Sequence, residues 1–130
     1  MAKFAGRRVF VVEDETLVLF GLEDILAELG CVVVAQAMRL EQALAKAHEL
    51  GPVDAAILDV NIGGRTVFPA AQVLAERGVP LLFATGYGRE GLPEEWQAHP
   101  VIVKPYSPQD VERALTSLLM PDEAGAEGLP

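Results

Sequence analysis

The chain has 130 residues, 51% of them hydrophobic and 22% charged, and a formal net charge of −9 at pH 7. This length and composition predict one globular domain with a core of its own. The acidic balance argues against non-specific binding to nucleic acid or to an anionic membrane, because either needs a surplus of Lys and Arg. The single cysteine, Cys31, excludes an internal disulfide and a cysteine-cluster metal site, so we expect it to be a small core residue.

The N-terminal and C-terminal stretches of the sequence bear on compartment and domain boundaries. No N-terminal apolar stretch is long enough for a signal peptide or a membrane span, so we expect a cytoplasmic protein. We predict one domain over 1–120 and a polar, disordered tail over 121–130. The tail is too short for a DNA-binding module, so we expect no nucleic-acid partner.

Apolar runs typical of buried strands alternate along the chain with segments of helical periodicity. The predicted strands are residues 8–12, 31–37, 53–58, 79–84 and 100–103. The predicted helices are residues 16–30, 39–50, a segment between 66 and 78, and a segment from 108 onward.

Turn and cap residues bound the predicted helices. Gly30 should end the first helix and Gly51–Pro52 the second. Thr66 could cap the third helix. Ser107 is followed by Pro108 at the first helical position and by an acid three residues after the cap, which is typical of a capping box.

The stretch between the last two strands has the weakest pattern. It contains several glycines, and only residues 93–97 have a helical pattern. We therefore expect the fourth helix to be short or mobile.

The alternation of five strands with helices predicts an α/β fold with a parallel sheet covered on both faces. Right-handed crossovers favour a doubly wound, flavodoxin-like sheet with strand order 2-1-3-4-5. Ligands in such sheets bind where the strand order reverses, here between strands 1 and 3. Asp14 and Asp59 follow these two strands and should flank that point.

The residues that follow each strand suggest a common chemistry. Glu13 and Asp14 follow strand 1, Asp59 follows strand 3, Thr85 follows strand 4 and Lys104 follows strand 5. Clustered carboxylates repel one another, and a hard divalent cation such as Mg²⁺ relieves that repulsion. A nearby Lys and a hydroxyl group can bind a transferred phosphoryl group. This set predicts phosphoryl transfer with Asp59 as the nucleophile.

These motifs resemble the receiver domain of two-component response regulators. The resemblance covers residues 7–120 and includes Val11-Val12-Glu13-Asp14-Glu15, Leu58-Asp59, Thr85 and Lys104-Pro105-Tyr106. It implies that Asp59 accepts a phosphoryl group from a phosphohistidine on a histidine kinase and that Lys104 holds this group. It also implies that Asp14, Asp59 and the backbone carbonyl of Asn61 bind Mg²⁺, with Glu13 acting through water. In this family Lys104-Pro105 is usually a cis peptide.

A narrower resemblance points to a subgroup. Residues 83–87, Phe-Ala-Thr-Gly-Tyr, are similar to the signature of FATGUY receivers. Such receivers resemble partners of HWE and related histidine kinases, and some stand alone. We therefore expect a stand-alone receiver that relays a signal by a conformational change or by onward transfer to a histidine phosphotransferase, and that catalyses only its own phosphorylation and dephosphorylation.

The chain departs from the usual receiver pattern at three places. Glu13 replaces an aspartate, and Ile62-Gly63 stands where most receivers have Met-Pro. Val101 occupies the position of the aromatic that normally couples to the threonine. We therefore expect Thr85 and Tyr87 to form the switch, with the loop over 86–99 becoming ordered on phosphorylation.

Three other functions are compatible with parts of this pattern. A phosphorylation-independent interaction module of receiver fold would have no need of the acid cluster with Thr85 and Lys104. A phosphatase of the haloacid dehalogenase type would need an aspartate at position 61, where this chain has Asn. A flavin carrier would need a Ser/Thr/Gly-rich phosphate loop after strand 1, where this chain has Glu13-Asp14-Glu15.

Overall fold

The computed structural model describes residues 2–121, so the predicted tail lies outside the described residues except for Pro121. Five parallel strands form the central sheet in the order β2-β1-β3-β6-β7, which confirms the predicted order 2-1-3-4-5. The strands are β1 (Arg8–Val12), β2 (Val32–Ala37), β3 (Ala55–Asp59), β6 (Leu81–Thr85) and β7 (Val101–Val103).

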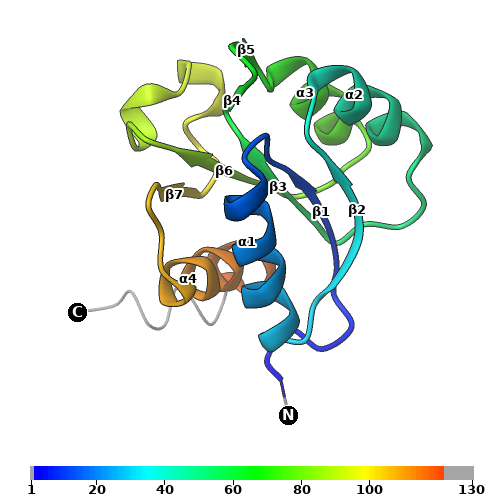
Figure 1. The fold of residues 1–130 in the computed structure, drawn as a ribbon, viewed down its shortest axis with the longest axis vertical. Coiled ribbons are helices and arrows are strands. Elements are labelled where there is room, and N and C mark those ends of the chain that lie inside the picture. Colours follow the sequence, from blue (N-terminus) through cyan, green and yellow to red (C-terminus); the bar gives the residue numbers. More distant parts are fainter. Residues whose placement is uncertain (1, 122–130) are drawn as a thin grey trace.

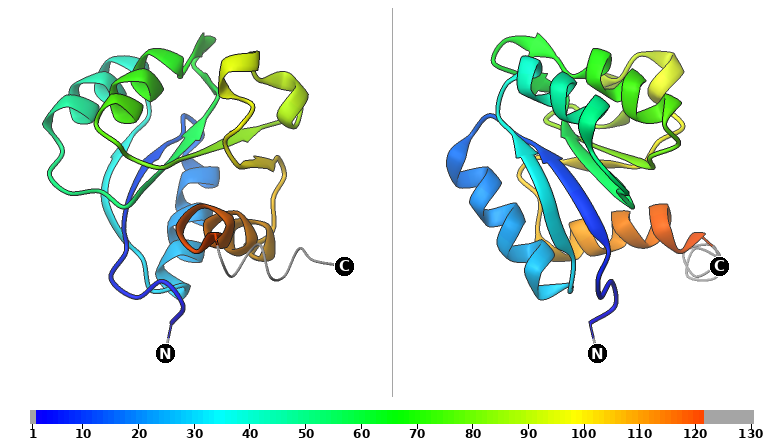
Figure 2. Two further views of the ribbon diagram at one scale, coloured as in Figure 1. Left: turned by 180° about the vertical axis from the view of Figure 1, so that it is seen from behind. Right: turned by 90° about the vertical axis from the view of Figure 1, so that its right-hand side faces the viewer.

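Two helices cover each face of the sheet (Figures 1 and 2). One face carries α1 (Thr16–Glu28) and α4 (Pro108–Leu119), and the other carries α2 (Leu40–Glu49) and α3 (Phe68–Glu76). Successive side chains of a strand point to opposite faces, so each central strand contributes to both cores. In β1, for example, Val11 packs in the core beside α1 and Phe10 in the core beside α2 and α3. This two-sided burial explains why the strands are continuous apolar runs.

The helix ends follow the sequence signals in most cases. Gly30, with φ of 88°, follows α1, and the left-handed conformation there favours glycine. Ser107 caps α4: its Oγ accepts from the Asp110 N–H at 3.1 Å, and its own N–H donates to the Asp110 carboxylate at 2.8 Å. The prediction that Thr66 caps α3 is wrong, because α3 begins after Val67.

Thr66 instead belongs to a small hairpin that the sequence pattern does not predict. Strands β4 (Asn61–Ile62) and β5 (Arg65–Thr66) pair antiparallel directly after β3. The connecting residues, Gly63 and Gly64, have φ of 60° and 82°. A two-residue hairpin turn of this type requires positive φ at both positions, which glycine adopts without strain.

The crossover between β6 and β7 contains no α-helix. Two short 3-10 turns, η1 (Arg89–Gly91) and η2 (Glu94–Trp96), take its place, as expected for a short fourth helix. Trp96 is only 7% exposed, and its ring centroid lies 5.7 Å from those of Phe68 and Phe83. The crossover is thus held to the sheet by aromatic packing.

The structure bears on two further features of the sequence, the apolar length of its helices and the position of Cys31. Among residues 2–121, no helix is both long and apolar enough to cross a membrane. Cys31 is buried, as expected for a core residue, and burial raises the pKa of its thiol.

Candidate functional site

The residues singled out in the sequence lie at the carboxyl ends of four neighbouring strands. Asp59 is the last residue of β3 and Thr85 the last of β6, while Glu13 follows β1 and Lys104 follows β7. Parallel strands place their carboxyl ends at one edge of the sheet, so residues distant in sequence meet there.

Lys104 joins two buried carboxylates at this edge. Its Nζ lies 2.7 Å from Asp59 Oδ2 and 2.9 Å from Glu13 Oε1. Asp59 is only 6% exposed and Glu13 only 2%. One ammonium group therefore compensates two carboxylates that have little access to water, which leaves an excess of negative charge.

The pKa values of these groups reflect this crowding. Burial, together with the adjacent Asp59 carboxyl, raises the pKa of Glu13 to about 7, although Lys104 acts in the opposite direction. Burial by itself would lower the pKa of Lys104, but its hydrogen bonds with Asp59 and Glu13 outweigh this effect and raise it.

Asp14 completes an acidic cluster. Glu13, Asp14 and Asp59 each offer one carboxylate oxygen, and these oxygens lie within 4.8 Å of one another. Asp14 Oδ2 accepts from the Gly63 N–H at 2.8 Å, which ties the hairpin to the cluster. A partly exposed set of carboxylate oxygens with excess negative charge fits a hard cation such as Mg²⁺.

Asn61 lies beside this cluster. Its backbone N–H donates to Asp59 Oδ1 at 3.3 Å, and the residue lines the same pocket as Asp14 and Lys104. The role of its carbonyl oxygen as a metal ligand stays a prediction.

Thr85 and Tyr87 line the same pocket, which has a volume of about 510 Å³. Thr85 is buried, and its Oγ1 accepts from the Tyr87 N–H at 3.1 Å. The Tyr87 side chain is 86% exposed. Val101 is partly buried against the core on the α2–α3 face of the sheet, and β7 (Val101–Val103) contains no aromatic residue that could couple to Thr85.

One contributor was not anticipated. The Gly63 N–H reaches Asp14 only because of the β4–β5 hairpin. The sequence feature that could have predicted this hairpin is the glycine pair Gly63-Gly64 between Ile62 and Arg65. Tyr106, half-buried next to the site, has its pKa raised to about 12, chiefly by burial and then by the charge of Glu13. The peptide bond between Lys104 and Pro105 is cis, as the resemblance implied.

The comparisons with known proteins agree with this arrangement. The transcriptional regulatory protein PdtaR of Mycobacterium tuberculosis is 32% identical over 113 residues, which cover 84% of this chain and 55% of PdtaR. The chain therefore spans about half the length of the curated relatives that it matches.

Two solved structures match this chain over nearly their whole length. The solution structure of SdrG from Sphingomonas melonis Fr1 superposes with a TM-score of 0.77 at 38% identity, covering 88% of this chain and 97% of SdrG. A structure of SdrG from Pseudomonas melonis Fr1, described as its BeF₃-activated conformation, gives 0.74 at 37% identity and covers 88% and 98% of the two chains. The family model of the response regulator receiver domain matches residues 9–116. The chain belongs to the response regulator receiver domain family.

Proposed function

We propose that this receiver accepts a phosphoryl group on Asp59 from the phosphohistidine of a histidine kinase. The observation that carries the proposal is the Asp59 carboxylate in the acidic pocket, 2.7 Å from Lys104 Nζ. A carboxylate oxygen of Asp59 attacks phosphorus, and the phosphorus–nitrogen bond breaks with its electron pair left on the imidazole. The product is an acyl phosphate. Attack by water on phosphorus then breaks the new bond and releases phosphate.

Asp14, Asp59 and the backbone carbonyl of Asn61 would hold Mg²⁺, with Glu13 acting through water. The three clustered carboxylates support this assignment. Bound magnesium supplies positive charge that offsets the carboxylates and the phosphoryl oxygens. Lys104 transfers its hydrogen bond from Asp59 to a phosphoryl oxygen, and the Thr85 hydroxyl donates a hydrogen bond to another.

The same event drives the proposed switch. When the Thr85 hydroxyl turns to the phosphoryl group, its hydrogen bond from the Tyr87 N–H is lost, and Tyr87 moves with the crossover. The bond at 3.1 Å and the glycines on either side of Tyr87 support this coupling.

We assign the receiver to the FATGUY subgroup, with an HWE or related histidine kinase as phosphoryl donor. The Phe-Ala-Thr-Gly-Tyr motif over 83–87 and the short crossover turns support this assignment. Onward transfer to a histidine phosphotransferase is compatible with the same chemistry. The chain acts in the cytoplasm and catalyses only its own phosphorylation and dephosphorylation.

Titration with beryllofluoride and Mg²⁺, followed by NMR of the backbone amides, tests the proposal. BeF₃⁻ occupies the position of the phosphoryl group on the acceptor carboxylate. We expect Mg²⁺-dependent shifts at Asp14, Asp59, Thr85 and Lys104 that spread into 86–99, and none of these BeF₃⁻ effects in Asp59→Asn. No response at millimolar Mg²⁺ would instead favour the phosphorylation-independent interaction module.

A further inference from the structure

Thr66 carries a hydroxyl group that the described part of the chain leaves unused. It does not cap α3, and within residues 2–121 its hydroxyl has no hydrogen-bond partner. The residue is exposed to solvent, yet it lines the acceptor pocket together with Asp59 and Asn61. A hydroxyl group can both donate and accept, so this one is available to a molecule that enters the pocket.

The pairing of the β4–β5 hairpin determines which side chains lie beside Thr66. Thr66 is opposite Asn61, and the next pair is joined by the hydrogen bond from the Val67 N–H to the Val60 carbonyl at 2.9 Å. Hydrogen-bonded and non-hydrogen-bonded pairs alternate in an antiparallel ladder, so Asn61 and Thr66 form a non-hydrogen-bonded pair. The side chains of such a pair lie on one face, with their Cβ atoms about 5 Å apart. The Asn61 amide and the Thr66 hydroxyl are therefore neighbours on the pocket face of the hairpin.

Two contacts hold the hairpin at the carboxyl edge of the sheet (Figure 1). At its turn, the Gly63 N–H donates to Asp14 Oδ2 at 2.8 Å. Arg65, whose side chain points to the face opposite that of Thr66, forms an ion pair with Glu41 of α2. The hairpin is thus tied both to the acid cluster and to the α2 layer, which keeps Thr66 at the pocket wall.

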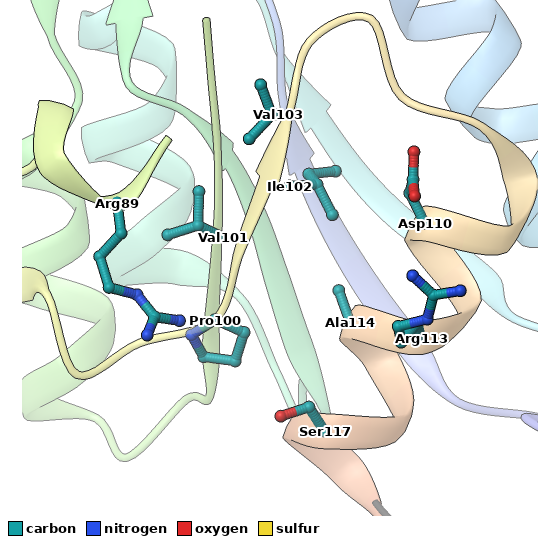
Figure 3. A pocket seen from close by; sticks show the side chains of 9 residues that line it. All are labelled: Arg89, Pro100, Val101, Ile102, Val103, Asp110, Arg113, Ala114 and Ser117. Carbon is teal, nitrogen blue, oxygen red and sulfur yellow. The ribbon is translucent and has the colours of Figure 1, made fainter. Parts of the chain in front are cut away.

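A water molecule that hydrolyses a phosphorylated Asp59 has to approach through this pocket. In-line displacement requires attack from the side opposite the bond between phosphorus and the Asp59 oxygen, which is the side away from the sheet. The groove between η1, β7 and α4 offers no second route, because its lining contains no member of the acid cluster (Figure 3). The acceptor pocket, with its volume of about 510 Å³, has room for a phosphoryl group and for ordered water.

We propose that Thr66 positions the water that hydrolyses phosphorylated Asp59 and so shortens the lifetime of the signal. The inference rests on the proposed function, phosphorylation of Asp59. Thr66 Oγ1 accepts a hydrogen bond from the water, and its own hydroxyl donates to the side-chain oxygen of Asn61. The water oxygen bonds to phosphorus, and the bond from phosphorus to Asp59 breaks with its electron pair left on the carboxylate. Both protons of the water leave with the phosphate.

The decay of the phosphorylated chain tests this role. The full chain is loaded with phosphoramidate and Mg²⁺, the donor is removed, and the phosphorylated fraction is followed by mass spectrometry of the intact chain. We expect Thr66→Val to lose phosphate about fivefold more slowly than the wild type, as loss of one hydrogen bond predicts. Thr66→Ser keeps the hydroxyl and should decay at the wild-type rate. Thr116→Val, the same change at a buried site on α4, is the control and should also decay at the wild-type rate.

A second measurement separates the positioning of water from damage to the pocket. Beryllofluoride binds in place of the phosphoryl group and needs no attacking water, so Thr66→Val should bind it, with Mg²⁺, as tightly as the wild type. Equal decay in Thr66→Val and the wild type would overturn the inference, and so would slow decay in Thr66→Ser or Thr116→Val, or weaker beryllofluoride binding by Thr66→Val. A wild type that takes up no phosphate would overturn the proposed function itself, and this inference with it.

Discussion

Gly91 and Thr85 show how closely single residues are fitted around the acceptor pocket. A Cβ atom on Gly91 would lie 2.7 Å from the Cβ of Tyr87 and 3.5 Å from Thr85 Oγ1. The Tyr87 Cβ is fixed to the backbone, so the crossover cannot relieve this contact by a side-chain rotation alone. The absence of a side chain at position 91 therefore allows the crossover to pack beside the two proposed switch residues.

Gly91→Ala should break the hydrogen bond from the Tyr87 N–H to Thr85 Oγ1, because the added methyl group displaces η1 from Tyr87. The backbone amide shift and hydrogen-exchange rate of Tyr87 measure this effect. Gly51→Ala, remote from the pocket, is the matched control, because its methyl group would also meet nothing within 4 Å. Similar shifts in both variants would contradict the proposed packing.

His99 should make stability depend on pH. Its ring lies 5.6 Å, centroid to centroid, from the rings of both Phe83 and Trp96, and burial lowers the pKa of His99 from the usual 6.5. The unfolded chain therefore binds a proton at His99 more readily than the folded chain does. The neutral His99 ring thus contributes to stability above pH 6.5, and this contribution is lost as the pH falls through the lower pKa of His99 in the folded chain.

Urea unfolding above and below pH 6.5 measures this contribution. The wild type should lose more stability on acidification than His99→Gln, which has no imidazole to protonate at this position. His48→Gln, at an exposed site on α2, controls for general effects of a lost histidine. An equal loss in the wild type and in His99→Gln would show that His99 makes no contribution.

At the scale of elements, local sequence signals determine the start of α4 but not the start of α3. The α4 helix begins with a reciprocal cap between Ser107 and Asp110, whereas α3 has no side-chain cap and begins where the β4–β5 hairpin ends. The Val67 N–H donates to the Val60 carbonyl at 2.9 Å, so the chain's return from the hairpin determines where α3 starts. The hairpin therefore determines where α3 starts, and it also places the Gly63 N–H at the acid cluster.

Ser107→Ala should lower the free energy of unfolding by about 1 kcal/mol, because one backbone N–H at the start of α4 loses its side-chain acceptor. Urea unfolding monitored by circular dichroism measures the change. Ser117→Ala, at an exposed site of the same helix, should change stability much less. A variant at position 107 as stable as the one at 117 would contradict the importance of the cap.

At the scale of the whole molecule, aromatic packing replaces the missing crossover helix. Trp96 of η2 stacks on Phe68 of α3, with an interplanar angle of 14°, and meets Phe83 of β6 edge-on. The elements α3, β6 and η2, which lie within residues 68–96, are thereby joined on one face of the sheet. The crossover depends on these long-range contacts, because two 3-10 turns have little stability of their own.

Trp96→Ala should lower the free energy of unfolding by about 3–5 kcal/mol, as expected for truncation of a large buried aromatic side chain. Trp96→Phe, which keeps one aromatic ring in the cluster, should cost clearly less. Urea unfolding followed by circular dichroism compares the two variants. If Trp96→Ala were as stable as Trp96→Phe, the crossover would have to be held by other contacts.

The sequence by itself determined the order of the sheet and the residues that its carboxyl edge brings together. Apolar runs report burial on both faces, and a parallel sheet places all its carboxyl ends at one edge, so Asp14, Asp59, Thr85 and Lys104 could be placed near one another before the structure was known. The Ser107 cap was equally predictable, because every group in it lies within four residues.

Only the tertiary structure decided the features that depend on partners distant in the chain. Trp96 could have been a surface anchor, and its burial follows from Phe68 and Phe83, which the fold brings beside it. The β4–β5 hairpin, which local sequence signals did not predict, contains Thr66 and makes α3 begin at Phe68. Local periodicity carries no information about these contacts, because they form only when the whole sheet and its two helical layers are assembled.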